Sequence, residues 1–177
     1  MKRMIAISVL MVLAALNASA VQQGESARTA TREKLRRVLA TSGPRINVDF
    51  QQSEKQPFNF AGVMRKGLMH CDSLEIVVGV SSNDTIAFRI YPHYKGGYIN
   101  SDKVRNGPGL MRLLLSFSDK NFLYWGIDSS GDVFAGYTFT LESGFPPEAI
   151  DVVVRSITNL DKSVGEMRPF IDGTTGD

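Results

Sequence analysis

Large apolar residues alternate with other residues in two neighbouring segments near the middle of the chain. In "LEIVVGV" (74–80) and "TIAFRIY" (85–91) they occupy Leu74, Ile76, Val78, Val80, Ile86, Phe88 and Ile90. A period of two places such positions on one face of a strand. The intervening "SSND" consists of turn-forming residues. The pattern therefore predicts a β-hairpin with one apolar face.

Three more segments resemble strands. "YKGGYIN" (94–100) is short and precedes the break at "NGPG", so it predicts a brief third strand. "NFLYWGI" (121–127) and "VFAGYTFTL" (133–141) are rich in aromatic and β-branched residues and flank Asp128–Asp132. They predict a second hairpin.

Apolar residues at three- and four-residue steps predict helices elsewhere. One is expected at Ser26–Thr41, a second at Phe58–Met69 despite Gly62 and Gly67, and a third in "GLMRLLLSF" from Gly109. The strongest helical pattern starts at "PPEA" and continues through Ile150, Val153, Val154, Ile157, Leu160 and Val164. It predicts a long closing helix.

This order of elements predicts an α+β domain. We expect an antiparallel sheet of about five strands, covered by helices on one face. The expected organisation is a cleaved leader at 1–20, an N-terminal helix and linker at 21–57, one domain at 58–171 and a disordered tail at 172–177.

The first twenty residues predict a secretory signal peptide. Lys2 and Arg3 precede an apolar run from Met4 to Leu16, and Ala18 and Ala20 fit an A-x-A cleavage site. The apolar run is shorter than the roughly 20 residues that span a bilayer. We therefore expect a periplasmic or secreted bacterial protein with no stable membrane insertion after cleavage.

The charge of the chain limits the partners to be expected, and its cysteine content shows whether a disulfide can stabilise it. The chain has 20 Lys and Arg against 18 Asp and Glu, and Lys2 and Arg3 leave with the leader. The mature chain then has no net charge, which removes a global electrostatic argument for binding nucleic acid. Cys71 is the only cysteine, so stability must come from packing rather than from an intramolecular disulfide.

The second half of the chain resembles a known family. "NFLYWGID", a glycine-containing turn and "GDVFAGYTFTLESGFPPEAIDVVVRSI" are similar to the YbjN-like family, proposed bacterial regulators of sensory transduction. The similarity spans residues 74–170. It implies a fold like that of type III secretion chaperones, often dimeric, without a recognised enzymatic activity. Those chaperones are acidic cytoplasmic proteins, so the leader and the neutral mature charge argue against a secretion-chaperone role here.

Asp128–Asp132, "DSSGD", contains carboxylates that could bind a cation. A Ca²⁺ loop of the EF-hand type needs a bidentate Glu at its twelfth position, and Phe139 stands there. A hairpin turn with Gly131 at positive φ is the preferred interpretation. No metal or cofactor is expected.

Cys71, in "HCD" (70–72), and His93 are the ingredients of a thiol nucleophile and its base. No oxyanion element can be recognised in the sequence. A buried, unreactive cysteine is the preferred interpretation. A thiol-dependent hydrolase that uses Cys71 and His93 is the alternative function.

Aromatic residues fall on the strand face opposite the predicted core. Strand alternation places four of them there: Tyr91, Phe122, Tyr124 and Phe134. Apolar patches of this kind mark contact sites. Three accounts are open, namely burial beneath the N-terminal helices, a homodimer interface, or a groove for a partner or an apolar ligand. We expect an exported, non-enzymatic interaction module, regulatory or chaperone-like, that binds a protein partner or a second copy through this face.

The signal-peptide hypothesis predicts that the mature protein begins at Val21, directly after the A-x-A site. Sequencing the N-terminus of protein isolated from its native host checks this. Native protein that begins at Met1 would show that the leader is not processed.

Overall fold

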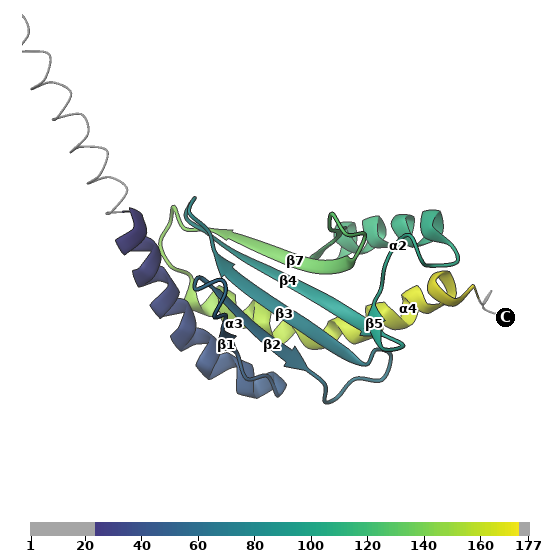
Figure 1. Ribbon diagram of the computed structural model, residues 1–177, viewed down its shortest axis with the longest axis horizontal. Helices are drawn as coiled ribbons and strands as arrows, with labels where there is room; N and C mark the ends of the chain where they lie inside the picture. Colours follow the sequence, from purple (N-terminus) through teal and green to yellow (C-terminus); the bar gives the residue numbers. More distant parts are fainter. Residues whose placement is uncertain (1–23, 174–177) are drawn as a thin grey trace, which may run out of the picture.

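The structure, a computed structural model, describes residues 24–173 and contains a seven-stranded antiparallel sheet with helices on one face (Figure 1). The strands are β1 (Gln51–Gln52), β2 (Asn59–Met64), β3 (Ser73–Val80), β4 (Thr85–Tyr94), β5 (Gly97–Tyr98), β6 (Tyr124–Ile127) and β7 (Val133–Thr140). Their order is β1-β2-β3-β4-β7-β6, and β5 pairs with β4. The predicted α+β class with one-sided helical cover is confirmed.

The helical layer consists of five named elements and the N-terminal helix, which covers residues 24–42. The named elements are η1 (Gly43–Ile46), α2 (Gly107–Lys120), α3 (Pro147–Ser156), η2 (Ile157–Asn159) and α4 (Leu160–Asp172). The predicted closing helix is present, but the 3₁₀ turn η2 divides it into α3 and α4. The predicted signal peptide, 1–20, lies outside the described residues.

The predicted first hairpin is formed by β3 and β4, and its apolar face is the centre of the core. Ile76, Phe88 and Ile90 on this inner face are fully buried. The register pairs Ile76 with Ile90, so the inner-face side chains of the two strands lie side by side. On α3, Val153 and Val154 are equally buried. The helical stripe and the inner face of the sheet therefore form one core.

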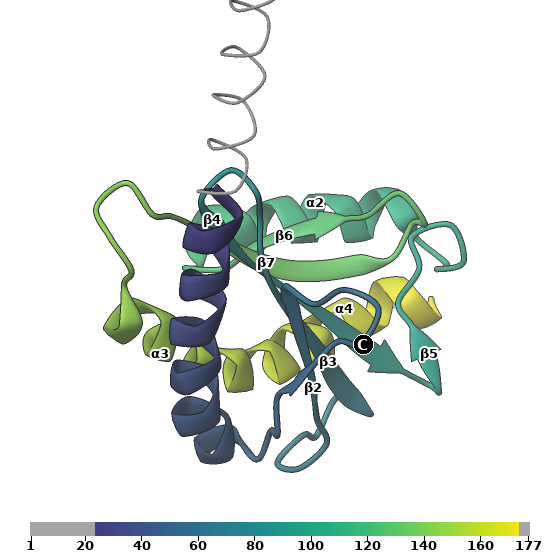
Figure 2. The ribbon, with the colours of Figure 1, turned by 60° about the vertical axis from the view of Figure 1, so that its left-hand side comes forward.

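The N-terminal helix, which was predicted to precede the domain, is part of the same core. Leu35 and Leu39 are buried in the same cluster. At one end of the helix, Arg28 donates two hydrogen bonds to the carbonyl of Val80, at 2.9 and 2.6 Å. Just beyond its other end, Arg45 pairs with Asp151 of α3 at 3.1 Å. Figure 2 shows the helix standing beside α3.

The prediction of a helix at Phe58–Met69 is wrong, because β2 occupies Asn59–Met64. Phe60, Gly62 and Met64 are buried at every second position, which is the period of a strand. A Cβ at Gly62 would lie 2.5 Å from a methyl carbon of Val48. The glycine that weakened the helical pattern thus lets the segment before β1 cross the inner face closely.

The predicted C-terminal tail also begins too early. Asp172 is the last residue of α4, and its carboxylate accepts a hydrogen bond from the hydroxyl of Tyr94 at 2.7 Å. Lys95 pairs with the same carboxylate at 2.7 Å. These contacts fasten the end of α4 to the β4–β5 turn. Residues 174–177 lie outside the described part of the chain.

The β6 edge of the sheet is closed by a side chain of α2. The hydroxyl of Ser118 accepts a hydrogen bond from the N–H of Trp125 at 2.7 Å and lies 3.3 Å from the carbonyl of the same residue. Unpaired N–H and C=O groups on an edge strand invite pairing with another chain. At Trp125 the N–H is bonded within the fold, and the Ser118 hydroxyl lies against the carbonyl.

Between residues 24 and 173 no helix combines the length and the apolar character needed to cross a membrane.

Replacing Val153 by Asp should unfold much of the protein, because it buries a charge with no partner. The side chain is fully buried, and the cost should be several kcal/mol. Domains of this size are stable by only about 5 to 15 kcal/mol. Val152→Asp is the matched control, since Val152 precedes it on α3 and is 45% exposed. Thermal unfolding of both variants checks this, and equal melting temperatures would contradict the assigned core face.

Candidate functional site

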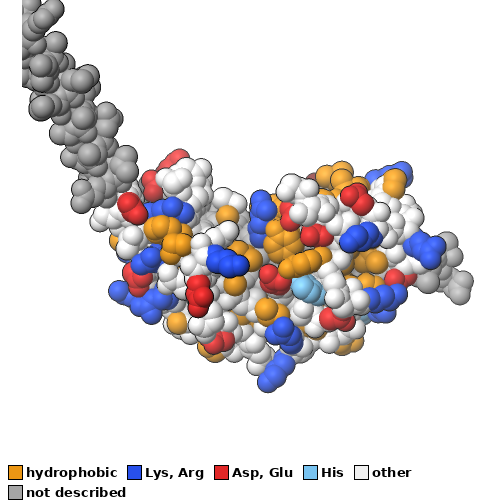
Figure 3. All heavy atoms as spheres, viewed as in Figure 1, with side chains coloured by type: hydrophobic (Ala, Val, Ile, Leu, Met, Phe, Trp, Pro, Cys, Tyr) orange, Lys and Arg blue, Asp and Glu red, His pale blue; other side chains and the backbone are white. Residues whose placement is uncertain are grey.

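The outer face of the sheet, opposite the helices, carries an exposed group of aromatic side chains. Tyr98 and Tyr124 are 45% and 40% exposed, large fractions for aromatic residues on a sheet. Figure 3 shows hydrophobic side chains gathered on this face, with side chains of both charges beside them. The face is also hollowed next to this gathering.

Two cross-strand pairs of an aromatic residue and a glycine build the centre of the group. Tyr124 is opposite Gly136, and Phe134 is opposite Gly126. A Cβ at Gly136 would lie 2.7 Å from the ring of Tyr124, and a Cβ at Gly126 would lie 3.0 Å from the ring of Phe134. Each ring therefore lies flat over the glycine of the neighbouring strand. The "YWG" and "FAG" triplets form two interlocked pairs.

The rings pack on one another around Phe134. The ring centroid of Phe134 lies 5.7 Å from that of Tyr91 and 6.1 Å from that of Tyr124, and Tyr98 lies 5.8 Å from Tyr91. The Arg89 guanidinium lies 4.8 Å from the Phe134 centroid. Only 6% of Phe134 is exposed, so it forms the base on which the others pack. We call Tyr91, Tyr98, Tyr124 and Phe134 the aromatic cluster.

A carboxylate and an imidazole border the cluster. The hydroxyl of Tyr98 donates to Glu75 at 2.7 Å, and a ring nitrogen of His93 lies 3.2 Å from the same oxygen. The hydrogen bond to Glu75 is the main cause that raises the pKa of Tyr98 to about 12. Tyr98 is therefore a neutral donor at physiological pH, and the negative charge of Glu75 is engaged inside the cluster.

Three of the four predicted site residues are brought together, and the fourth is not. Phe122 precedes β6 and stacks on Tyr137, with centroids 4.6 Å apart. It lines a separate hollow of about 200 Å³ that also contains Trp125 and Leu160. Strand alternation does not apply to Phe122, because β6 begins at Tyr124. The assignment of Phe122 to the outer face is therefore wrong.

Tyr98 is the member of the cluster that sequence reasoning missed. It lies in β5, which has only two residues and no alternation to interpret. The pairing of His93 with Tyr98 brings it beside the imidazole, with ring centroids 4.3 Å apart. Its position depends on the tight turn at Lys95 and Gly96, both at positive φ.

The N-terminal helix, as far as it is described, leaves the aromatic cluster open. Its apolar residues Leu35 and Leu39 enter the core, and Arg28 reaches the far end of β3 at Val80. Tyr124 remains 40% exposed. Of the three open accounts of the aromatic face, burial beneath the N-terminal helices is thus not met by residues 24–42.

A groove runs over the outer face between the N-terminal helix and the cluster. It has a volume of about 510 Å³. Its lining residues are Arg28, Gln56, Asn59, Val77, Gly79, Val80, Ser81, Ala87, Arg89 and Tyr91. We call it the basic groove, because two arginines and no carboxylate line it. Tyr91 belongs to both the groove and the cluster, so the two form one continuous surface.

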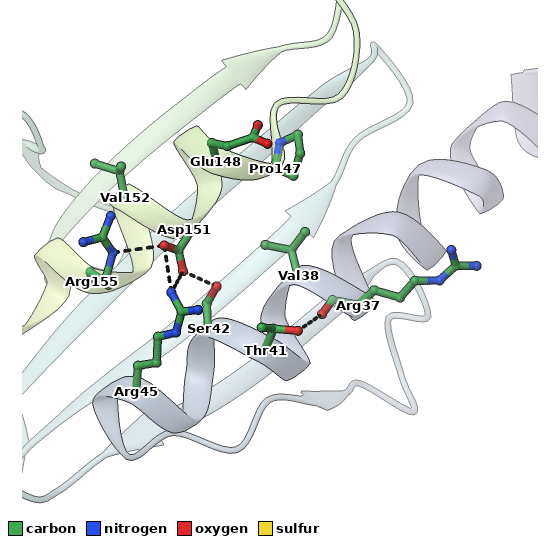
Figure 4. A pocket seen from close by; sticks show the side chains of 10 residues that line it. All are labelled: Arg37, Val38, Thr41, Ser42, Arg45, Pro147, Glu148, Asp151, Val152 and Arg155. Atoms are coloured by element: carbon green, nitrogen blue, oxygen red, sulfur yellow. Dashed lines mark hydrogen bonds and ion pairs between the residues drawn. The ribbon is translucent and has the colours of Figure 1, made fainter.

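A second hollow, of about 540 Å³, lies between the N-terminal helix and α3 (Figure 4). Asp151 is its central group and binds Ser42, Arg45 and Arg155. The hydrogen bond from Ser42 is the main cause that lowers the pKa of Asp151. Its polar groups are occupied with one another and hold the helix to α3. The hollow is thus better explained as a joint between helices than as a binding site.

The structure does not form the hypothesised thiol–imidazole pair. Cys71 is buried and donates its thiol proton to Asp161 of α4 at 3.3 Å, whereas His93 lies on the outer face beside Glu75. Burial and the hydrogen bond to Asp161 raise the pKa of Cys71 to about 12. A nucleophilic cysteine needs a lowered pKa. The arrangement is that of a structural thiol.

Asp161 organises the loop that contains Cys71. Burial alone would raise the pKa of this carboxylate, but N–H groups of Met69, His70 and Cys71 donate to it and lower the pKa below its usual value. The three bonds measure 2.9, 2.9 and 3.0 Å. The carboxylate therefore anchors the loop before β3.

The Asp128–Asp132 segment is a hairpin turn, as predicted. Gly131 has φ of 83°, and the carboxylate of Asp128 accepts hydrogen bonds from the N–H groups of Ser130 and Asp132. The side chain of Asp128 thus satisfies two backbone N–H groups of the turn. Among the described residues no cluster of three or more His, Cys, Asp or Glu side chains could hold a metal.

Comparison with known proteins gives neighbours in backbone structure alone. No protein-family model matches the chain, and no curated protein matches its sequence. Among solved structures, it is similar to YbjN from E. coli, a proposed transcription regulator, with 12% identity over 77% of this chain and 90% of that one, at a TM-score of 0.49. It is also similar to the ExsC–ExsE complex, with 16% identity over 80% and 97%, at a TM-score of 0.44. The structural neighbours thus include the protein after which the predicted family is named.

The environment of Cys71 predicts a thiol that does not react in the folded protein. With a pKa of about 12, almost no thiolate is present at pH 8, and the sulfur is buried. Iodoacetamide labelling at pH 8, followed by mass spectrometry, should modify the protein only after a denaturant is added. Rapid labelling of the native protein would restore the hypothesis of a catalytic cysteine.

Proposed function

We propose that this chain is an exported, non-enzymatic binding module that engages a protein partner through the outer face of its sheet. The aromatic cluster is the contact surface, and the proposal includes a regulatory or chaperone-like role in the periplasm or outside the cell. The leader-like sequence of residues 1–20 supports the compartment.

A single observation carries the proposal: an ordered aromatic surface lies on the sheet face that the described helices leave open. Tyr98 and Tyr124 are held by ring packing and cross-strand pairing, yet remain 45% and 40% exposed. Tyrosine is enriched in protein interfaces because it offers a large rigid contact area and a polar hydroxyl. Fixed rings also lose little conformational entropy on binding.

The form of the surface favours a polypeptide over a small molecule. Small-molecule sites enclose most of their ligand in a cavity. Here the basic groove and the aromatic cluster extend along β3 and β4 and open to the surface (Figure 3). A partner with both polar and aromatic contacts matches the composition of this face.

The contacts of Cys71 support a function without thiol catalysis. The thiol is committed to Asp161, and the imidazole of His93 is committed to Glu75. Neither group is placed to activate the other.

Replacing Tyr124 by Ala should weaken partner binding by on the order of 2 kcal/mol, because it removes one of the two most exposed rings of the aromatic cluster. Phe122→Ala is the matched control: it is 51% exposed and two residues away, but stacks on Tyr137 outside the cluster. A photoreactive phenylalanine analogue placed at 124 or at 122, followed by irradiation of intact cells, identifies what each position touches. We expect a discrete cross-linked protein from position 124 only.

Sedimentation of the purified wild type and of Tyr124→Ala separates a second copy from another partner. A cross-link between two copies, with a dimer that Tyr124→Ala dissociates, would assign the face to homodimerisation. Equal cross-linking from both positions, or none from position 124, would contradict the proposed surface.

A further inference from the structure

The two arginines of the basic groove are held in place by aromatic rings rather than by carboxylates. The Arg28 guanidinium lies 3.7 Å from the centroid of Phe58, and the Arg89 guanidinium lies 4.8 Å from that of Phe134. In the described part of the chain neither forms a salt bridge. Arg28 donates from Nε and one amino group to the carbonyl of Val80, and one amino group of Arg89 lies 3.5 Å from the hydroxyl of Tyr91. Each guanidinium keeps its charge and its remaining N–H donors, which can receive a carboxylate.

Two carboxylates lie near the arginines and the cluster, and both are engaged within the fold. Asp128 accepts hydrogen bonds from the N–H groups of Ser130 and Asp132, and its charge acts on Arg89 without forming a salt bridge. Glu75 is engaged by Tyr98 at 2.7 Å and by His93 at 3.2 Å. The groove is therefore positively charged in its composition, although the whole chain carries a formal charge of only +2. The local charge is a property of this face and not of the overall composition.

The floor of the groove is formed by small and polar residues of β2, β3 and β4. Gly79 and Ala87 are opposite each other in the register of β3 and β4, so neither strand places a large side chain at the centre of the floor, where the Asn59 amide lies over Gly79. Arg28 is bonded at Val80, and Arg89 is opposite Val77, three residues back along β3. At about 3.3 Å per residue, the two arginines are on the order of 10 Å apart along the strand direction. This distance spans a few residues of an extended chain.

The aromatic cluster continues the groove in the same direction. Along the outer face of β4, Arg89 is followed by Tyr91, which packs on Phe134 at 5.7 Å between centroids. An extended occupant that passes Arg28 and then Arg89 would reach the cluster next. Along the strand direction an occupant would therefore meet Arg28, the small residues of the floor, Arg89 and then the aromatic cluster.

From this order we propose that the partner contributes an extended acidic segment, in which two carboxylates bind Arg28 and Arg89 and a following apolar side chain packs on the aromatic cluster. The inference rests on the proposed function and adds the chemistry of the partner to it. Charge-assisted hydrogen bonds between arginine and carboxylate give the segment its register.

Selection of linear peptides from a random phage-displayed library on the purified protein tests the inference. We expect selected peptides to be enriched in Asp and Glu a few residues before an aromatic or aliphatic residue. Synthetic copies should bind about tenfold more weakly to Arg89→Gln, and binding should weaken as salt is added. Arg89 is exposed, so its replacement tests charge without disturbing the core. Arg112→Gln, an exposed arginine on α2, is the matched control and should bind as the wild type does.

A charge exchange provides the sharper comparison. Arg89→Glu should lose the acidic peptides and bind counterparts in which the matching acidic residue is replaced by Lys. Arg28→Gln is secondary, because Arg28 also fastens the N-terminal helix to Val80; its binding is to be compared with its melting temperature.

Three outcomes would overturn the inference: selection of no peptides, of peptides without acidic enrichment, or of peptides insensitive to Arg89→Glu. Tighter binding of a single-stranded oligonucleotide than of the acidic peptides, lost in Arg89→Glu, would assign the arginines to phosphates instead. The proposed function is tested separately by Tyr124→Ala. Selected peptides that are lost in Tyr124→Ala but unaffected in Arg89→Glu would leave the aromatic surface standing and reject the acidic segment alone.

Discussion

The packing of α3 and α4 against the inner face of β3 and β4 is the contact on which the rest of the structure depends. Ile76, Phe88 and Val153 are fully buried in it, and burial of this kind supplies most of the free energy of folding. Because side chains alternate across a strand, the same packing directs Arg89 and Tyr91 to the outer face. A shift of one residue in register would exchange the two faces. The face of the proposed binding surface is thus set by the core behind it.

Close packing in the outer face turns separate aromatic residues into one surface. Gly126 and Gly136 leave room for the rings of the neighbouring strand, and Phe134 is buried among the others although none of the helices in residues 24–173 covers it. An alanine at Gly136 would also approach the carbonyl of Phe88 at 2.9 Å. Because these two glycines have no side chain, the rings can pack directly on the backbone of the neighbouring strand, and this packing holds the rings in place.

The polar groups of the fold divide into those that stabilise it and those that remain available. Asp161 and Asp151 are committed to a loop and to a helix joint, and Ser118 closes the edge of β6. A partner strand cannot pair with Trp125 as it stands, because the N–H of this residue is already bonded to Ser118. The outer face, with Arg28 and Arg89 stacked on rings, is where charge is left for another molecule. The proposed recognition surface is accordingly the face of the sheet and not this edge.

Local sequence patterns were sufficient for the elements whose burial is periodic. The alternation around Phe88 and the helical stripe around Val153 each predicted an element and its buried face, because each pattern repeats over several residues. The segment that forms β2 was predicted to be a helix. The reason for a glycine at position 62 is the close approach of the segment around Val48, which a local pattern does not contain. The position of Phe122 depended on where β6 begins, which no local pattern specifies.

The sequence by itself determined the α+β class, the two hairpins, the core face of the sheet and the presence of aromatic residues opposite it. Tertiary structure alone decided that Tyr98 joins the cluster, that Cys71 and His93 separate, and that Arg28 lies at one end of a groove with Arg89. These last relations connect residues far apart in the chain through β5, α4 and the N-terminal helix. Periodicity records which face a residue occupies, whereas such contacts depend on how complete elements pack against one another.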